Sequence, residues 1–233
     1  MPSEAAGGTR PTLVARLLQH PASVAVMDAV PVPLALARVW LGHDNAREVA
    51  RDDWARLADP SEQPRYAAVR DAVARNAPHG STCSVLDVGC SRGLLLDGLA
   101  CGRYLGVDAS PGAVAVAEQE RGDAHATFAV ADAVTYAPPE PFDAIVVNEV
   151  VYYLPRPRQV LRRYAASLAP EGVLVVSIFA RAWASRRLLR RLAADLEPVE
   201  SRTVGSGHLA WTVAVYRRGP DLPGEPSPQG YRH

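Results

Sequence analysis

The chain has 233 residues, of which 48% are hydrophobic and 21% charged, so it can bury a full core without disulfides, and we expect one soluble domain with an appendage. Its 25 basic residues balance its 25 acidic residues, and this net charge of +0 argues against general binding to nucleic acid or to an acidic membrane. All the basic residues are arginine, which excludes lysine Schiff-base chemistry and a phosphate-binding loop ending in Gly-Lys-Ser/Thr.

The cysteine content and the hydropathy favour a cytoplasmic protein. Cys83, Cys90 and Cys101 are odd in number and lack metal-ligand spacing, so we predict neither a disulfide framework nor a metal site. The most apolar early stretch, residues 24–41, is interrupted by charged residues and prolines, and no basic region with a clean apolar run precedes it. We therefore expect no membrane span, no signal peptide and a reducing compartment.

Residues 1–80 are predicted to form a helical cap or lid segment, because they show no strand-like alternation. One clear helix covers residues 64–77, where three apolar residues recur at helical spacing: Tyr66, Val69 and Val73. The arginines of this helix, Arg65 among them, are expected to face away from that apolar stripe. The stripe must pack on another part of the chain, and a lid of this kind would exclude water from an active site.

Short β-branched runs alternate with helical segments from residue 84 to residue 180. The five runs cover residues 85–88, 104–107, 127–130, 144–147 and 173–176. This alternation predicts a parallel sheet that is covered by helices on both faces. Ser110 and Pro111 supply the N-cap and the first-turn proline of the helix after the second run.

The last part of the chain predicts a helix and a hairpin. An arginine-rich helix at residues 181–196 precedes strands at residues 199–204 and 209–216. The joining segment Gly205-Ser206-Gly207-His208 is short enough for an antiparallel hairpin. We interpret the arginines at residues 186–191 as a solvated helix face.

These elements predict an α/β fold with a Rossmann-like, doubly wound, seven-stranded sheet, built of five parallel strands and the C-terminal antiparallel hairpin. Residues 81–218 are expected to form this domain, with residues 1–80 as its N-terminal helical segment. Residues 219–233 are rich in proline and glycine and poor in apolar groups, so they are predicted to be a disordered tail.

A glycine turn follows the first strand. The sequence Asp87-Val88-Gly89-Cys90-Ser91-Arg92-Gly93 leads from that strand into a helix predicted at Leu94–Ala100. A ligand can approach the backbone closely only where side chains are absent. Asp108 ends the next strand, where an open α/β sheet presents an acid to ribose hydroxyls. Asp132 follows the third strand, where it can accept a hydrogen bond from an exocyclic amine, so the sequence predicts a nucleoside site.

The glycine spacing indicates which nucleoside is bound. Gly89 and Gly93 are separated by three residues, none of them glycine, so the dinucleotide fingerprint Gly-x-Gly-x-x-Gly is absent. Without an evident pyrophosphate cradle, the site suits adenosine that carries no phosphates. A nicotinamide-dependent oxidoreductase on the same sheet is therefore the less favoured alternative.

With these motifs the chain resembles the class I S-adenosylmethionine-dependent methyltransferases over residues 84–216. The resemblance implies S-adenosyl-L-methionine as the cofactor and S-adenosyl-L-homocysteine as its product, with the methionine moiety over the glycine turn and the ribose on Asp108. The adenine would then lie between Ala109 and Ala133, with Asp132 at its amine. The implied cofactor-binding residues are Asp87, Gly89, Cys90, Ser91, Gly93, Asp108, Ala109, Asp132, Ala133 and Asn148.

Three residues of the turn carry further expectations. Asp87 is expected either to hold backbone amides of the turn or to contact the cofactor. Cys90 is interpreted as a small packing residue. Many members of the family have glycine where this chain has Ser91, and serine is compatible with the turn if its backbone is not left-handed.

The fourth-strand motif indicates the kind of acceptor. Members of the family that methylate nucleic-acid bases or glutamine side chains usually carry a sequence like Asn/Asp-Pro-Pro-Tyr there, whereas this chain has Asn148-Glu149-Val150-Val151-Tyr152-Tyr153-Leu154. This form is similar to that of small-molecule N- and O-methyltransferases, including the nodulation-type sugar N-methyltransferases. We expect transfer to an O or N atom of a small molecule, such as a biosynthetic intermediate of a specialised metabolite, with no nucleic-acid or membrane partner. The oligomeric state stays open.

The catalytic candidates follow from where the fourth strand ends. Methyl transfer from a sulfonium is a direct displacement, so positioning dominates, and a hydroxyl acceptor also gains from a general base. Glu149 is the first candidate, because ligands bind at the carboxyl ends of such strands. Tyr152 and Tyr153 are expected either to line the acceptor pocket or to belong to the core, and His208 is a weaker base candidate. A protein of this fold that transfers no methyl group is the second alternative.

Overall fold

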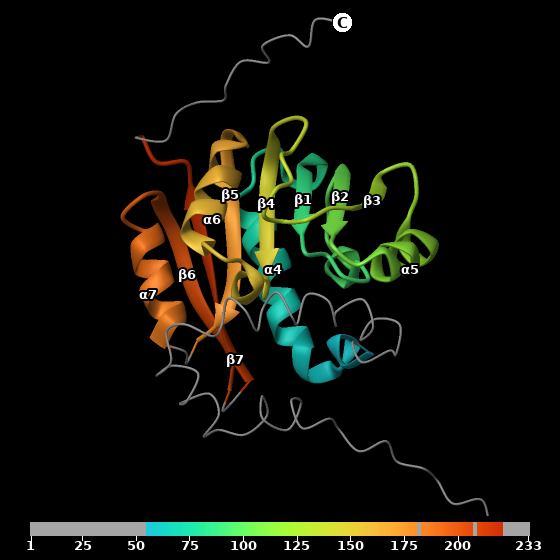
Figure 1. Ribbon diagram of the computed structural model, residues 1–233, viewed down its shortest axis with the longest axis horizontal. Coiled ribbons are helices and arrows are strands. Elements are labelled where there is room, and N and C mark those ends of the chain that lie inside the picture. Colours follow the sequence, from blue (N-terminus) through green and yellow to red (C-terminus); the bar gives the residue numbers. More distant parts are fainter. Residues whose placement is uncertain (1–54, 181–182, 207–208, 221–233) are drawn as a thin grey trace, which may run out of the picture.

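The computed structural model describes residues 55–180, 183–206 and 209–220, which form one seven-stranded sheet with the order β3-β2-β1-β4-β5-β7-β6 (Figure 1). Strands β1 to β5 pair in parallel, and β7 pairs antiparallel with both β5 and β6. The strands are β1 Ser84–Val88, β2 Arg103–Asp108, β3 Ala126–Val130, β4 Phe142–Asn148, β5 Leu168–Phe179, β6 Glu197–Ser206 and β7 Leu209–Arg217. The predicted fold class and all seven predicted strands are confirmed.

Helices cover both faces of the sheet. They are α4 Gln63–Asn76, α5 Pro111–Arg121, α6 Pro157–Ala166 and α7 Trp183–Leu192, with 3-10 turns η1 Ala55–Ala58, η2 Pro60–Glu62, η3 Gly80–Thr82, η4 Leu94–Leu96 and η5 Val151–Tyr153. Helices α6 and α7 pack on one face, and α4 packs on the other (Figure 1). Strands β4 and β5 run between these layers and are apolar on both faces, as is typical of a central parallel strand.

Helix α4 buries the predicted apolar stripe against the sheet. Tyr66, Val69 and Val73 are all buried in one core cluster with residues of β1, β4 and β5. The expectation that Arg65 faces away is wrong, because Arg65 is only 2% exposed. Its guanidinium lies over the rings of Tyr66 and Trp211, so it is packed between α4 and β7.

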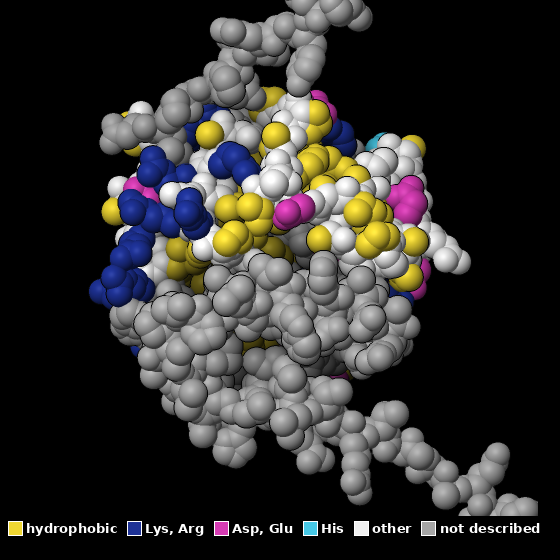
Figure 2. Space-filling view, in the orientation of Figure 1, with side chains coloured by type: hydrophobic (Ala, Val, Ile, Leu, Met, Phe, Trp, Pro, Cys, Tyr) yellow, Lys and Arg dark blue, Asp and Glu magenta, His cyan; other side chains and the backbone are white. Residues whose placement is uncertain are grey.

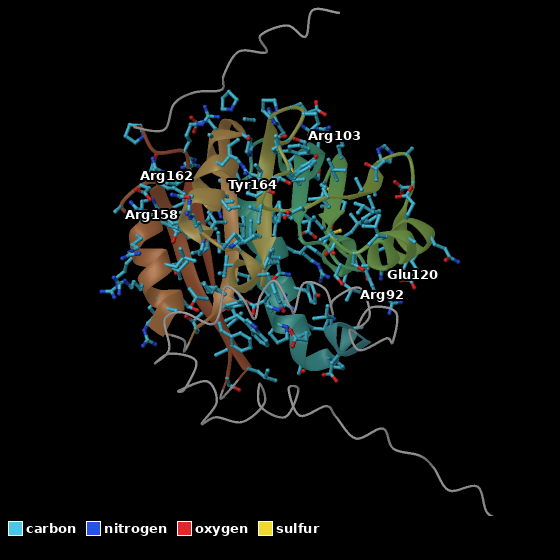
Figure 3. All side chains as sticks on the ribbon, in the orientation of Figure 1. Arg92, Arg103, Glu120, Arg158, Arg162 and Tyr164 are labelled. Carbon is cyan, nitrogen blue, oxygen red and sulfur yellow. The ribbon has the colours of Figure 1, made fainter. Side chains whose placement is uncertain are left out.

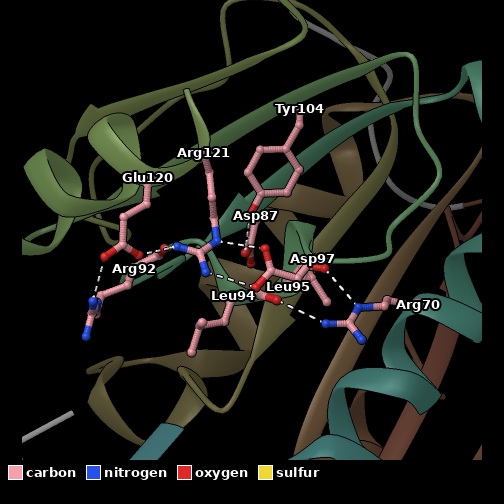
Figure 4. Close-up of polar contacts among 9 residues, drawn as sticks. All are labelled: Arg70, Asp87, Arg92, Leu94, Leu95, Asp97, Tyr104, Glu120 and Arg121. Atoms are coloured by element: carbon pink, nitrogen blue, oxygen red, sulfur yellow. Dashed lines mark hydrogen bonds and ion pairs between the residues drawn. The ribbon is translucent and has the colours of Figure 1, made fainter. Parts of the chain in front are cut away.

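The helix predicted at Leu94–Ala100 is not formed, and only the 3-10 turn η4 occurs there. Arg70 donates to the carbonyl groups of Leu94 and Leu95 at 3.0 Å each, and these carbonyls would otherwise accept helical hydrogen bonds (Figure 4). Gly98 then has φ 83, a left-handed conformation that ends the turn. Tertiary contacts from α4 therefore override the local preference for a helix.

The arginine-rich helix α7 ends at Leu192, four residues before the predicted end. Leu188, Leu189 and Leu192 contact the core, while its arginines are exposed and contribute to the basic side chains gathered at the left of Figure 2, as expected for a solvated face. Arg158 of α6 (labelled in Figure 3) forms an ion pair with Asp195, which lies just beyond α7, and this pair joins the two helices at their outer surface.

Several sequence predictions fall on residues that the structure does not describe. The first 54 residues of the predicted cap, the loop residues Gly207 and His208, and the tail from residue 221 onward lie outside the described residues. Within the described residues no helix is long and apolar enough to cross a membrane, and no group of three or more potential metal-ligating side chains occurs.

Candidate active site

The glycine turn after β1 and the segment after β4 are packed directly together. Gly89 has φ 75, and its amide donates to the carbonyl of Val107 at 2.7 Å. A Cβ atom on Gly89 would lie 2.3 Å from a methyl carbon of Val150, so a side chain cannot be accommodated there. The structure therefore brings the predicted first motif and the fourth-strand motif into contact.

Serine is expected to be compatible with the turn at position 91 if its backbone is not left-handed. The structure does not meet this condition, because Ser91 has φ 49. The turn is nevertheless held, because the Ser91 amide donates to Asp108 Oδ2 at 2.8 Å and the Ser110 amide donates to Asp108 Oδ1 at 2.9 Å. Burial raises the pKa of Asp108, while these amides act in the opposite direction. Each oxygen of a carboxylate can accept a second hydrogen bond, so Asp108 keeps acceptor capacity for a hydroxyl.

Asp87 lies inside the sheet and is only 2% exposed. The hydroxyl of Tyr104 donates to its Oδ2 at 2.6 Å, and among the described residues its buried Oδ1 has no partner (Figure 4). Burial raises the pKa of Asp87 to about 7, so this carboxyl gains or loses its proton near neutral pH. The unpaired Oδ1 is a polar atom that a ligand group or a bound water would satisfy.

The predicted adenine side is built from two loops at the ends of β2 and β3. Ala109 and Asp132 are exposed, and Asp132 Oδ1 accepts the amide of Val134 at 2.8 Å. The carbonyl of Ala133 accepts hydrogen bonds from two α6 side chains, Tyr164 at 2.9 Å and Arg163 at 3.0 Å. Helix α6, which carries Tyr164 (labelled in Figure 3), thus fixes the backbone beside Asp132.

Glu149 combines a strained backbone with a perturbed carboxyl group. Its φ is 62, an uncommon conformation for a residue other than glycine, and its amide donates to the carbonyl of Ser177. The hydroxyl of Ser177 lies 3.4 Å from Glu149 Oε1. Burial raises the pKa of Glu149 to about 8, while the positive charge of Arg65 acts in the opposite direction. Such a residue at a strand end is a candidate for proton transfer.

The two tyrosines of η5 differ in environment. The hydroxyl of Tyr152 accepts the backbone amide of Phe179, and burial raises the pKa of Tyr152. Its ring centroid lies 6.3 Å from that of Phe179, so Tyr152 joins η5 to the end of β5 beside Glu149. Tyr153 is 41% exposed and faces outward from the core.

Two residues that contact Asn148 and Glu149 were not predicted from the sequence. Arg65 Nη1 donates to Asn148 Oδ1 at 2.6 Å, and nothing in the spacing of α4 distinguishes this arginine from its neighbours. Ser177 is fully buried on β5, and here a signal existed, because it is the one polar residue between Val173 and Phe179. A lone hydroxyl within a buried apolar strand needs a partner, and Glu149 lies within reach.

A family model for a methyltransferase domain matches residues 46–212. The chain belongs to this family. The match, together with the fold, confirms the resemblance to class I S-adenosylmethionine-dependent methyltransferases, and it favours this family over the alternative of a nicotinamide-dependent oxidoreductase.

Relatives with known names agree with this assignment. Nodulation protein S of Bradyrhizobium diazoefficiens is 35% identical over 139 residues, covering 55% of this chain and 64% of that protein. A trans-aconitate 2-methyltransferase of Methylobacterium nodulans is 36% identical over 140 residues, covering 58% and 52%. The matched region thus spans between about half and two thirds of the length of these relatives.

A solved structure has the same fold. The N-methyltransferase NodS from Bradyrhizobium japonicum WM9, in complex with S-adenosyl-L-homocysteine, superimposes with a TM-score of 0.64 and 29% identity, covering 75% of this chain and 96% of that one. The glycine turn, the remaining acceptor capacity of Asp108 and the unpaired Oδ1 of Asp87 fit the cofactor of the family, S-adenosyl-L-methionine. The expected cofactor contacts of individual residues stay predictions.

Proposed function

We propose that this protein transfers a methyl group from S-adenosyl-L-methionine to an O or N atom of a small molecule. The observation that carries the proposal is Glu149, which directly follows β4. Its backbone is left-handed, with φ 62, and the pKa of its carboxyl group is raised to about 8. The next residue in the chain, Val150, packs against Gly89 of the glycine turn. Glu149 therefore belongs to the segment that contacts this turn. Family membership and a proton-transfer group beside the turn together support methyl transfer.

Each residue of the site would have a defined task. The cofactor, when bound, supplies an electrophilic methyl group on a sulfonium. Asp108, the glycine turn and the loop at Asp132 would hold the cofactor. A polar group of the bound cofactor would also give the unpaired Oδ1 of Asp87 a hydrogen-bond partner. The hydroxyl of Ser177 lies near Glu149 Oε1 and would restrict the orientation of this carboxyl group. In its ionised form Glu149 would accept the proton of a hydroxyl or amine acceptor.

The names of the relatives support a small acceptor. Nodulation protein S and trans-aconitate 2-methyltransferase are named for nodulation and for a small organic acid, and NodS is described as an N-methyltransferase. The similarity supports a small-molecule acceptor, and we propose a biosynthetic intermediate of a specialised metabolite. The sequence predicts a cap segment at residues 1–80, and because α4 packs on the sheet, we propose that the part of this segment ahead of α4 covers the acceptor and excludes water from it.

Calorimetry with two ligands tests the proposal. The purified protein is titrated with S-adenosyl-L-homocysteine and, separately, with NADH. We expect micromolar binding of the sulfur nucleoside alone, followed by methyl transfer to members of a panel of small amines, phenols and hydroxy acids. Absence of nucleoside binding would overturn the proposal. Binding without transfer to any panel member would favour a protein of this fold that does not methylate.

A further inference from the structure

Arg65 is a buried cation that reaches the site from outside the strands. It lies on α4 and is 2% exposed, and its guanidinium carbon is 4.4 Å from the ring centroid of Tyr66 and 5.7 Å from that of Trp211. Its Nε and Nη2 atoms donate to Glu62 Oε2 at 3.1 and 2.8 Å. Burying a cation is costly unless partners compensate for the lost solvation, so each of these contacts restricts its position.

The contact with Asn148 fixes the orientation of an amide at the end of β4. A guanidinium has donors but no acceptor, so the group of Asn148 that faces Arg65 at 2.6 Å must be its oxygen. The Nδ2 group of Asn148 is therefore directed away from Arg65, with two hydrogens to donate. Without this contact, either orientation of the amide would be possible.

The charge of Glu149 depends on groups from four elements. Arg65 comes from α4, Glu62 from η2, Tyr152 from η5 and Ser177 from β5. Among these groups Arg65 carries the positive charge that favours the ionised carboxylate, whereas the negative charge of Glu62 opposes it. The carboxyl of Glu149 follows Asn148 directly in the chain, so one arginine acts on two consecutive residues.

We propose that Arg65 is a positioning residue for the reaction, which holds the amide of Asn148 in one orientation at the end of β4 and supplies the buried positive charge that acts on the carboxyl group of Glu149. Its importance for catalysis rests on the proposed function, but its effect on Glu149 belongs to the ligand-free protein. The inference also gives α4 a role in the chemistry, although this helix precedes all the strands of the sheet.

Carboxyl NMR of the ligand-free full chain tests the proposal. The protein is labelled with ¹³C-glutamate, and the signal of Glu149 is identified by its absence in Glu149→Gln. In Arg65→Met we expect the titration midpoint of Glu149 to rise by about one pH unit, because the opposite charge is removed. Arg65→Lys, which keeps the charge but not the fork of donors, is expected to restore most of the midpoint. An unchanged midpoint in folded Arg65→Met would overturn the proposal.

Two further variants separate this effect from a general loosening of α4. Arg75→Met removes a partly exposed arginine of the same helix, which pairs with Glu200, and we expect it to leave the midpoint unchanged. Glu62→Gln is expected to lower the midpoint, because it removes a negative charge that itself opposes ionisation of Glu149. If Arg65→Met fails to fold, Arg65→Gln replaces it, since this variant removes the charge but keeps a hydrogen-bond donor, and an unchanged midpoint in folded Arg65→Gln overturns the proposal. None of these measurements uses the cofactor or an acceptor, so failure of the proposed methyl transfer would be seen separately.

Discussion

The amide of Ser91 donates to Asp108 Oδ2 at 2.8 Å, which joins the glycine turn after β1 to the end of β2. Asp108, which is predicted to bind a ribose, thus also holds a left-handed serine in place. The two strand ends form one structural unit, and a change at either residue should affect the other.

Replacing Asp108 by alanine should weaken binding of S-adenosyl-L-homocysteine by about 1.5–3 kcal/mol, the range for hydrogen bonds to a charged group. This corresponds to roughly a 10- to 150-fold increase in Kd, measured by calorimetry. Asp71→Ala, which changes an exposed acid of α4, is the control and should leave Kd unchanged. An Asp108→Ala variant with the wild-type Kd would remove Asp108 from the cofactor site.

Glycine at position 91 should stabilise the protein. Ser91 has φ 49, and a residue with a Cβ atom pays a cost in this conformation that glycine does not pay. After allowing for the greater chain entropy of unfolded glycine, we expect Ser91→Gly to raise the free energy of unfolding by about 0.5–1 kcal/mol, measured in urea. Glu171→Gly, at an exposed left-handed residue far from the turn, should give a similar gain. A loss of stability in Ser91→Gly alone would show that the hydroxyl is needed.

Removing the carboxylate at position 149 should impair turnover more than cofactor binding. Because the pKa of Glu149 is raised to about 8, its ionised form increases as the pH rises toward 8 and beyond. For an acceptor that must lose a proton, the wild-type rate should therefore rise with pH and level off above about 8. Glu149→Gln should lower kcat and abolish this rise, while the Kd of S-adenosyl-L-homocysteine changes little. A variant with wild-type kcat would exclude Glu149 as the base.

The buried carboxyl of Asp87 should make stability depend on pH. Its pKa is raised from 3.8 to about 7 in the folded protein, so between these values the folded chain binds more protons than the unfolded chain. The free energy of unfolding should then decrease as the pH rises from about 4 to about 7, and this contribution should be constant above 7. The free energy of unfolding is measured against pH for the wild type and for Asp87→Asn, and the difference between the two curves gives the contribution of Asp87. Glu149 contributes a slope of the same sign to both curves, so its effect cancels in the difference. A flat difference curve would contradict the raised pKa.

Patterns that depend on neighbours along the chain predicted most of the fold. Five apolar β-branched runs separated by helical segments predict a parallel sheet, and the first of them leads into the glycine turn. The features that the sequence did not predict depend on residues distant in the chain. Arg70 of α4 donates hydrogen bonds to the carbonyls of Leu94 and Leu95, which prevents a helix there. Asp108 accepts a hydrogen bond from the amide of Ser91 and holds it in a backbone conformation that serine rarely adopts. No local pattern specifies these contacts.

The same distinction holds for the candidate site. Asp108 and Glu149 could be named because the first ends a strand and the second follows one, and strand ends in such sheets meet at one edge. Asp87 could be named because it lies just before the glycine turn. Arg65 could not be named in this way. The periodicity of α4 shows which face of the helix is apolar, but it does not show that the long side chain of a neighbouring arginine reaches the end of β4. A charged residue next to an apolar stripe position is ordinarily solvated.

The position of α4 also determines what can be removed from the protein. This helix covers one apolar face of the sheet, where Val69 and Val73 contact a cluster that includes Val85 and Val146. A fragment that begins at residue 81 would keep every strand yet leave that face open to water. We expect such a fragment to aggregate on expression, whereas a chain that begins shortly before η1 should remain monodisperse in gel filtration. Deletion studies of any N-terminal lid must therefore stop ahead of this helix.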